Sequence, residues 1–163
     1  MAEIVTACVA LGGNLDDPRT QVERGFAALA ALTHTTLSAR SRLYRTPPWG
    51  VVDQPDFINA AARLETALAP RALLDALLAI EAAAGRVRGV RNGPRILDLD
   101  LLLYGDRIIV EPDLLMVPHP RLHERAFVLL PLADIAPNAE VPGQGHVADL
   151  LKRVDTAGCL PIG

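Results

Sequence analysis

The chain has 163 residues, of which 50% are apolar and 21% charged, and its formal net charge is −3. This length suits one domain with its own hydrophobic core, so we expect a single domain over residues 1–163. The acidic balance argues against a general nucleic-acid binder, and the lack of any run of 18 apolar residues argues against a membrane span.

The cysteines and the first residues bear on the compartment. Cys8 and Cys159 lie far apart, without the spacing of a zinc site, which favours free thiols in a reducing cytoplasm. The start MAEIVTACVALGG lacks the basic residues of a signal peptide and is typical of a strand. We therefore expect a cytoplasmic protein.

The first part of the chain predicts a strand, a helix and a second strand. Residues 3–11 are typical of a buried strand, and residues 17–32 place apolar side chains at helical spacing. Between them, Gly12-Gly13-Asn14 either makes a tight turn or lets a ligand approach the backbone. Residues 35–45 alternate, which predicts one half-exposed strand. One face of that strand would comprise Leu37, Ala39, Ser41 and Leu43.

A stiff loop and a third strand follow. Two prolines impose an extended segment before Trp49, and this loop is either a pocket wall or a surface connection. The strand at residues 56–65 places Phe57 and Asn59 on one face. An aromatic ring beside an amide can recognise a flat heterocycle, because the ring stacks while the amide donates and accepts. The alternative is an ordinary strand end.

A helix is predicted over residues 70–84, with Gly85 as its stop. Its apolar stripe would comprise Leu73, Leu74, Leu77, Leu78 and Ile80. Glu81 lies in the last turn, where a negative charge opposes the helix dipole. This position indicates a role for Glu81 toward a ligand, with a solvent-facing side chain as the alternative.

The stretch GRVRGVRNGPRILDLDLLLYG carries the clearest chemistry. Arg86, Arg95 and two further arginines are interleaved with glycines, which predicts a mobile loop. The strand at 96–103 then alternates, so Asp98 and Asp100 share one face. The other face would comprise Leu97, Leu99, Leu101 and Leu103.

The loop and the two aspartates together favour a site for a metal–nucleotide complex. Two magnesium ions that bridge one polyphosphate lie ~3.5–4 Å apart, and an Asp-x-Asp pair can hold both. Arginine forks neutralise phosphate oxygens. The alternatives are a solvated arginine loop and the wet face of an ordinary strand.

The remaining elements are shorter. A strand is expected at residues 107–110, followed by the segment VPHPR, in which two prolines hold His119 in an extended conformation. Its imidazole either reaches a phosphate or a leaving group, or lies in a surface loop. The stretch AFVLLPLADIAP predicts a core helix broken near Pro131, and a short helix is expected from Val147.

Several motifs of the chain resemble the 6-hydroxymethyl-7,8-dihydropterin pyrophosphokinase family, also called 2-amino-4-hydroxy-6-hydroxymethyldihydropteridine diphosphokinase. These motifs are YRTPPWG, DQPDFINAAARLET, IEAAAGRVR, NGPRILDLDLLLYG and VPHPRLHERAFVLLPLADIAP. The resemblance implies an α+β fold, a ferredoxin-like two-layer sandwich with a mainly antiparallel sheet. It also implies transfer of pyrophosphate from ATP to the hydroxymethyl group of the pterin, with release of AMP, in folate biosynthesis.

The resemblance also implies roles for individual residues. Asp98 and Asp100 match the ligands of two Mg²⁺ ions, and Arg86 and Arg95 match arginines that engage the triphosphate, so these four would be the catalytic residues. The ATP side would comprise Glu81, Arg86, Arg88, Arg95, His119 and Arg125. The pterin pocket would comprise Thr46, Pro47, Trp49, Phe57, Asn59 and Phe127. The expected partners are small molecules, without nucleic acid or membrane, and a monomer is expected.

Two rival predictions use the same features. A ferredoxin-like module could bind single-stranded RNA through the arginine loop, with no need for the two aspartates. A metal-dependent phosphohydrolase could use the same carboxylates and arginines. The products formed from ATP, with and without the pterin, distinguish the three functions.

Overall fold

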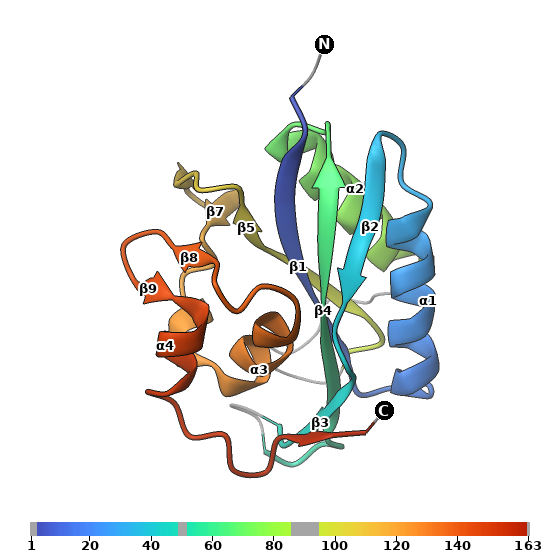
Figure 1. The fold of residues 1–163 in the computed structure, drawn as a ribbon. Coiled ribbons are helices and arrows are strands. Elements are labelled where there is room, and N and C mark those ends of the chain that lie inside the picture. The colour runs from blue at the N-terminus through green and yellow to red at the C-terminus, as the bar shows by residue number, and fades with distance from the viewer. Residues whose placement is uncertain (1–2, 49–51, 86–94, 163) are drawn as a thin grey trace.

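The computed structural model describes residues 3–48, 52–85 and 95–162 (Figure 1). The larger strands and helices are β1 (Val5–Gly13), α1 (Pro18–Ala30), β2 (Thr35–Arg40), β3 (Tyr44–Thr46), β4 (Phe57–Thr66), α2 (Pro70–Ala83), β5 (Asp98–Tyr104) and α3 (Ala126–Ile135). The short elements are β6 (Ile109–Glu111), β7 (Leu115–Val117), η1 (Leu122–Glu124), β8 (Glu140–Val141), β9 (Gly145–His146), α4 (Val147–Leu151) and β10 (Leu160–Pro161). Within these ranges no helix is long and apolar enough to cross a membrane.

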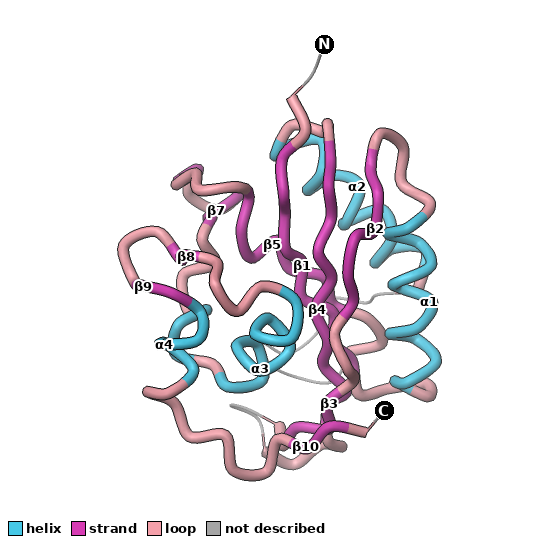
Figure 2. The backbone as a smooth tube through the Cα atoms, viewed as in Figure 1, coloured by secondary structure: helices cyan, strands magenta, loops and turns pink. Residues whose placement is uncertain are grey.

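The main sheet has the order β10-β3-β4-β1-β5, and β2 also pairs with β4. Its pairings are antiparallel, which confirms the predicted sheet. Helices α1 and α2 cover one face, while α3 and α4 cover part of the other (Figures 1 and 2). The predicted layer of two helices on an antiparallel sheet is therefore present, and a smaller helical layer is added behind it.

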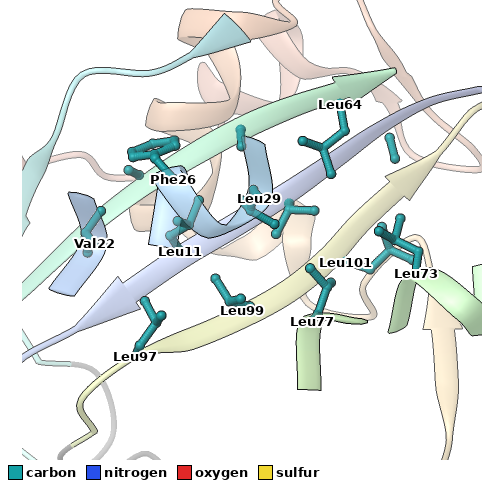
Figure 3. Packing of buried hydrophobic residues seen from close by; sticks show 14 of the residues in the cluster. Leu11, Val22, Phe26, Leu29, Leu64, Leu73, Leu77, Leu97, Leu99 and Leu101 are labelled. Carbon is teal, nitrogen blue, oxygen red and sulfur yellow. The ribbon is translucent and has the colours of Figure 1, made fainter. Parts of the chain in front are cut away.

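Each face of the sheet carries its own apolar core. Figure 3 shows part of the first, where Phe26 and Leu29 of α1 and Leu77 of α2 meet the leucines of β1 and β5. The second core forms between α3, α4 and the opposite side of the same strands. Cys8 of β1 is buried there as a free thiol, as predicted.

Two β-bulges overturn the predicted alternation. Val9 pairs with Leu101 but Cys8 pairs with Leu103, so Leu102 is an extra residue in β5. An extra residue reverses the faces beyond it, and Leu103 therefore lies in the second core, not with Leu97, Leu99 and Leu101.

A similar shift occurs between Leu37 and Ala39, which consequently pack on opposite faces. The single strand predicted at 35–45 is instead divided into β2 and β3.

The helices follow the predictions, with two corrections. Leu78, placed in the apolar stripe of α2, is 47% exposed, because the stripe of this helix passes through Leu73 and Leu77. Pro131 does not break α3, which continues to Ile135. The proline lacks one amide donor, but α3 buries a continuous apolar face in the second core, which offsets that loss.

The neighbouring leucines of α2 provide a matched test of the first core. Leu77 is 1% exposed and Leu78 is 47% exposed. Leu77→Ala should lower the free energy of unfolding by about 2–5 kcal/mol, because it leaves a cavity. Leu78→Ala should change it by about 0.5 kcal/mol or less. Urea unfolding followed by circular dichroism measures both, and equal effects would contradict the assigned helix face.

Candidate active site

A cavity opens on the α3 side of the sheet, between the ends of β1, β4 and β5 and the start of α3. It brings together most of the predicted site residues, although they come from distant parts of the chain. Those in its wall are Thr46, Pro47, Phe57, Asn59, Arg95, Asp98, Asp100, His119, Arg125 and Phe127. Trp49, Arg86 and Arg88 lie outside the described residues.

Gly12 of β1 lines the cavity between two of the predicted site residues. It pairs with Asn59 on β4 and with Asp98 on β5, so the amide and the first carboxylate flank one glycine. A Cβ atom on Gly12 would collide with the Asn59 side-chain oxygen, and one on Gly13 would collide with the Ile96 carbonyl. The two glycines therefore lie inside β1, not in a turn, and admit neighbouring protein groups. Gly12 also lines the cavity, and close approach of a ligand to its backbone stays a prediction.

The amide of Asn59 is held by a partner on the adjacent strand. Its Nδ2 donates to Thr46 Oγ1 at 2.7 Å, and Thr46 is buried. Thr46 stands opposite Phe57 in the β3–β4 pairing. The predicted ring–amide pair thus lies on one wall with its amide orientation set by a hydrogen bond.

Asn14 was predicted only as part of the Gly-Gly-Asn motif, with no partner named, and in the structure it joins two sides of the site. It is 4% exposed, and its Nδ2 donates to Gln54 Oε1 and to the Pro55 carbonyl, both at 2.9 Å. The Arg95 amide donates to Asn14 Oδ1 at 3.0 Å, and the Asn14 amide donates to the Arg95 carbonyl at 2.9 Å. Its position after two glycines was a signal for a turn, but its partners are too distant in sequence to be inferred.

The two aspartates share one face of β5, as predicted, and both line the cavity. Asp98 Oδ2 accepts a charged hydrogen bond from Arg95 Nη1 at 3.0 Å. Asp100 stands opposite Ala10, whose small side chain leaves room at the cavity floor. Burial, together with the charges of Asp98 and Glu81, raises the pKa of Asp100 to about 8, against the opposing charge of Arg95.

Glu81 lies behind this pair. It is 3% exposed, and its Oε2 accepts a hydrogen bond from the Leu99 amide at 2.6 Å. The solvent-facing alternative for Glu81 is therefore wrong. Its negative charge sits close enough to affect Asp100, so α2 and β5 together concentrate three carboxylates at one end of the sheet. Contact between Glu81 and ATP stays a prediction.

His119 and Arg125 form the opposite rim. The His119 amide donates to the Leu102 carbonyl at 3.2 Å, which holds the extended segment against β5. Burial and the charge of Arg125 lower the pKa of His119, so its imidazole is neutral at pH 7. The Arg125 guanidinium lies 5.6 Å from the centre of the Phe127 ring, an arrangement that stabilises the charge through the aromatic face.

A sheet whose cavity combines paired aspartates, arginines and an aromatic–amide wall is typical of enzymes that transfer groups from polyphosphates. Residues 8–137 match the family described as 7,8-dihydro-6-hydroxymethylpterin-pyrophosphokinase (HPPK). The chain therefore belongs to the HPPK family, which confirms the resemblance found in its motifs.

Individual relatives agree with this assignment. The chain is 51% identical over 143 residues to a 2-amino-4-hydroxy-6-hydroxymethyldihydropteridine pyrophosphokinase of Pseudomonas aeruginosa, covering 88% of each protein. It is 43% identical over 150 residues to the pyrophosphokinase of the same name from Haemophilus influenzae, covering 92% of this chain and 93% of that protein.

A solved structure of a triple mutant of Plasmodium falciparum HPPK-DHPS with STZ-DHP has a TM-score of 0.74 at 14% identity. The match covers 93% of this chain and 43% of that longer chain. At this identity the likeness concerns the fold alone, and it confirms the predicted ferredoxin-like class.

The raised pKa of Asp100 predicts how stability depends on pH in metal-free protein. Its folded pKa of about 8 exceeds the ordinary value of 3.8, so the folded state binds the extra proton and loses stability as pH rises from about 4 to 8. Asp100→Asn removes this loss. The variant should gain more stability over the unaltered protein at pH 8 than at pH 5, measured by urea unfolding in EDTA.

The exposed Asp106, in the turn after the same strand, gives the control. Asp106→Asn should change the free energy of unfolding by about 0.5 kcal/mol or less at both pH values, as is usual for substitutions of exposed side chains. A gain for Asp100→Asn that is independent of pH would contradict the electrostatic account.

Proposed function

We propose that this chain, acting as one domain over residues 1–163, transfers pyrophosphate from ATP to the hydroxymethyl oxygen of 6-hydroxymethyl-7,8-dihydropterin and releases AMP. Membership of the HPPK family supports the reaction. The observation that carries the residue assignment is that a carboxylate pair and an aromatic–amide wall meet in one cavity, on either side of Gly12. One bound molecule on each side would bring the two reacting groups together.

The carboxylates suit Mg²⁺. Among the described residues no group of three or more His, Cys, Asp and Glu side chains could hold a metal ion. Magnesium is commonly held by one or two carboxylates and completes its octahedron with water and substrate phosphates. The crowding that raises the pKa of Asp100 would also be relieved by a cation. We propose that Asp98 and Asp100 hold two ions, which would supply charge neutralisation to the triphosphate and orient it.

Cationic side chains would complete the nucleotide site. Arg95 donates to Asp98 at 3.0 Å, so its guanidinium would lie close to a phosphate group if Asp98 held the metal. Arg125 lies across the cavity, and the neutral imidazole of His119 can donate or accept a hydrogen bond beside it. Arg86 and Arg88 stay proposed ATP contacts outside the described residues.

The pterin would occupy the other half of the cavity. Phe57 and Phe127 come from β4 and α3 and supply two aromatic faces for a flat ring. Asn59 uses one hydrogen on Thr46 Oγ1, so its amide still offers a donor and an acceptor. Pro47 continues this wall, and Trp49, proposed for the same pocket, lies outside the described residues.

The chemical step needs positioning more than a strong base. This chain would orient the hydroxymethyl oxygen in line with the β-phosphorus while the arginines offset charge on the leaving AMP. As the new bond to the β-phosphorus forms, the bond from that phosphorus to the AMP oxygen would break, and the hydroxyl proton would pass to water. Burial of the carboxylate floor strengthens these interactions. The site is therefore best suited to transfer between two bound substrates.

Product analysis tests this function. Purified protein with ATP and Mg²⁺ should release AMP only when hydroxymethyldihydropterin is present, with one pterin pyrophosphate formed for each AMP. Release of ADP or phosphate without the pterin would instead support a phosphohydrolase. Chromatography of the nucleotides gives the outcome directly, and omission of Mg²⁺ with added EDTA should abolish turnover.

Asp98→Asn should reduce kcat by about 10³-fold, since it removes a charge that acts on the transferring group. Asp106→Asn is the same change in the exposed turn that follows β5, and it should retain the rate of the unaltered enzyme. Steady-state AMP release measures both, with thermal unfolding as a check on the fold. Full turnover by folded Asp98→Asn would refute its assignment as a metal ligand.

Gly12→Ala tests the pterin side independently. The added methyl group would displace the Asn59 amide, with which it collides. The variant should weaken pterin binding by about tenfold or more, because a displaced amide loses its hydrogen bonds to the ring. Isothermal titration with the pterin measures this. Unchanged pterin affinity in a folded variant would remove Asn59 from the proposed pocket.

A further inference from the structure

The two walls of the proposed pterin site belong to different elements, and a polar network joins them away from the cavity. Thr46 and Asn59 lie on β3 and β4, whereas Phe127 lies in the first turn of α3. The spacing of these walls must match the thickness of one flat ring. Apolar packing alone specifies such spacing weakly, since it has no preferred direction.

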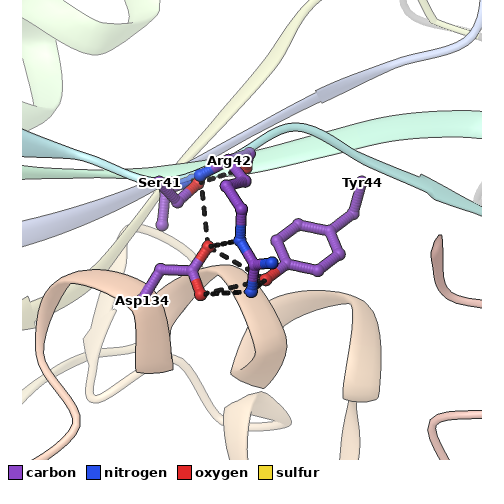
Figure 4. A network of polar contacts seen from close by, with 5 residues as sticks. Ser41, Arg42, Tyr44 and Asp134 are labelled. Carbon is purple, nitrogen blue, oxygen red and sulfur yellow. Dashed lines mark hydrogen bonds and ion pairs between the residues drawn. The ribbon is translucent and has the colours of Figure 1, made fainter. Parts of the chain in front are cut away.

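The network centres on Asp134, in the last turn of α3 (Figure 4). Its carboxylate accepts from the Arg42 amide at 3.1 Å and from the Arg42 guanidinium at 3.1 and 3.2 Å. It also accepts from the Tyr44 hydroxyl at 2.9 and 3.0 Å. Arg42 Nη2 donates to the same Tyr44 hydroxyl at 2.8 Å, which closes the network.

The position of Asp134 is costly for the helix itself. An acid near the C-terminus of a helix opposes the dipole, so its stabilisation must come from Arg42 and Tyr44. Against the effect of burial, these contacts lower the pKa of Asp134. Burial and the bond to Asp134 raise the pKa of Tyr44 to about 12, against the opposing effect of Arg42. Tyr44 is 2% exposed, whereas the side chains of Asp134 and Arg42 are 19% and 58% exposed, so the network lies where the core meets the surface.

The segment that Asp134 holds is bound to β4 on its other side. Ser41 is 5% exposed, its Oγ accepts from the Ala61 amide at 2.8 Å, and its own amide donates to the Ala61 carbonyl at 2.9 Å. Ala61 is two residues beyond Asn59 on the same face of β4. The residues between β2 and β3 therefore connect the strand of Asn59 to the helix of Phe127.

We propose that Asp134 is a positioning residue for the pterin, which it does not touch. Through Arg42 and Tyr44 it sets where α3 lies on the sheet, and so the gap between Phe127 and the Thr46–Asn59 wall. Seven residues separate Phe127 from Asp134, or about 10 Å along a rigid helix. A shift at one end is therefore carried to the other. This inference rests on the proposed function.

The expected signature is a selective loss of pterin recognition. Asp134→Asn and Tyr44→Phe should each raise the KM for hydroxymethyldihydropterin about fivefold or more while the KM for ATP stays within about twofold. Phe127 of α3 is a main wall of the proposed pterin site, whereas most of the proposed nucleotide and metal contacts lie outside α3. Tyr44→Phe removes one hydroxyl and retains the buried ring, so it keeps the test valid if Asp134→Asn is poorly folded.

The double variant Tyr44→Phe/Asp134→Asn separates coupling from general damage. Since both changes break the same bond, its KM for the pterin should be close to that of the worse single variant. Titration of the pterin into protein saturated with a non-hydrolysable ATP analogue and Mg²⁺ should give the same order of affinities.

Glu23→Gln is the matched control. Glu23 of α1 pairs with Arg40 at 2.7 Å on the other face of the sheet, and both side chains are nearly half exposed. This variant should leave both KM values unchanged. The inference would be overturned if the Asp134 and Tyr44 variants raised both KM values equally. It would also be overturned if they lowered thermal stability but left the ratio of the pterin KM to the ATP KM unchanged. Failure of the unaltered protein to form AMP from ATP and pterin would overturn the proposed function and this inference together.

Discussion

The pairing of β1 with two neighbours at Gly12 is the constraint on which the site depends. Asn59 stands on one side of this glycine and Asp98 on the other. Strands in a sheet lie ~4.8 Å apart, so the amide and the carboxylate are about two spacings, or ~10 Å, from each other along the hydrogen-bonding direction. The sheet therefore sets the separation between the proposed ring-binding wall and the carboxylate pair without any loop having to define it.

The same register explains why small residues line β1 at the site. Ala10 and Gly12 face the cavity, opposite Asp100 and Asp98. Larger side chains there would fill the space above the carboxylates. Beyond the cavity, the residue on this face of β1 is Cys8, buried in the second core. This face of β1 thus lines the cavity at Gly12 and Ala10 and packs in the second core at Cys8.

The three carboxylates at the cavity destabilise the ligand-free fold, and a bound cation would relieve this cost. Asp98, Asp100 and Glu81 are brought together where burial disfavours charge, and the raised pKa of Asp100 is the result. Arg95 offsets part of this repulsion. Such an arrangement has little value for folding, but a preorganised anionic site gains when cations bind, because the repulsion is removed without rearrangement.

Much of this site was predictable because it depends on local patterns. The alternation of ILDLDLLL placed both aspartates on one face of β5, and the spacing of Phe57 and Asn59 placed ring and amide together on β4. Alternation is a property of consecutive residues and needs no knowledge of partners. The helix stripes through Phe26 and Leu77 were predictable for the same reason.

The features that the sequence patterns did not predict share a different cause. The bulges at Leu102 and between Leu37 and Ala39 depend on how two strands pair, which neither strand encodes alone. The partners of Asn14 and Asp134 lie 40 to 92 residues away in the sequence, and no periodicity reports such distances. Their roles emerge only when the chain has folded, in keeping with the long-range nature of sheet topology.

The existence of the cavity itself follows from unequal lengths. Strand β4 has 10 residues and α3 also has 10, but a strand rises ~3.3 Å per residue and a helix 1.5 Å. A helix of about 15 Å therefore covers less than half of a strand of about 33 Å. Where α3 covers the sheet, the face is apolar and forms the second core; beyond Phe127 the same face carries Asn59, Asp98 and Asp100. The site is thus the uncovered end of a core, and Phe127 marks the boundary between the two.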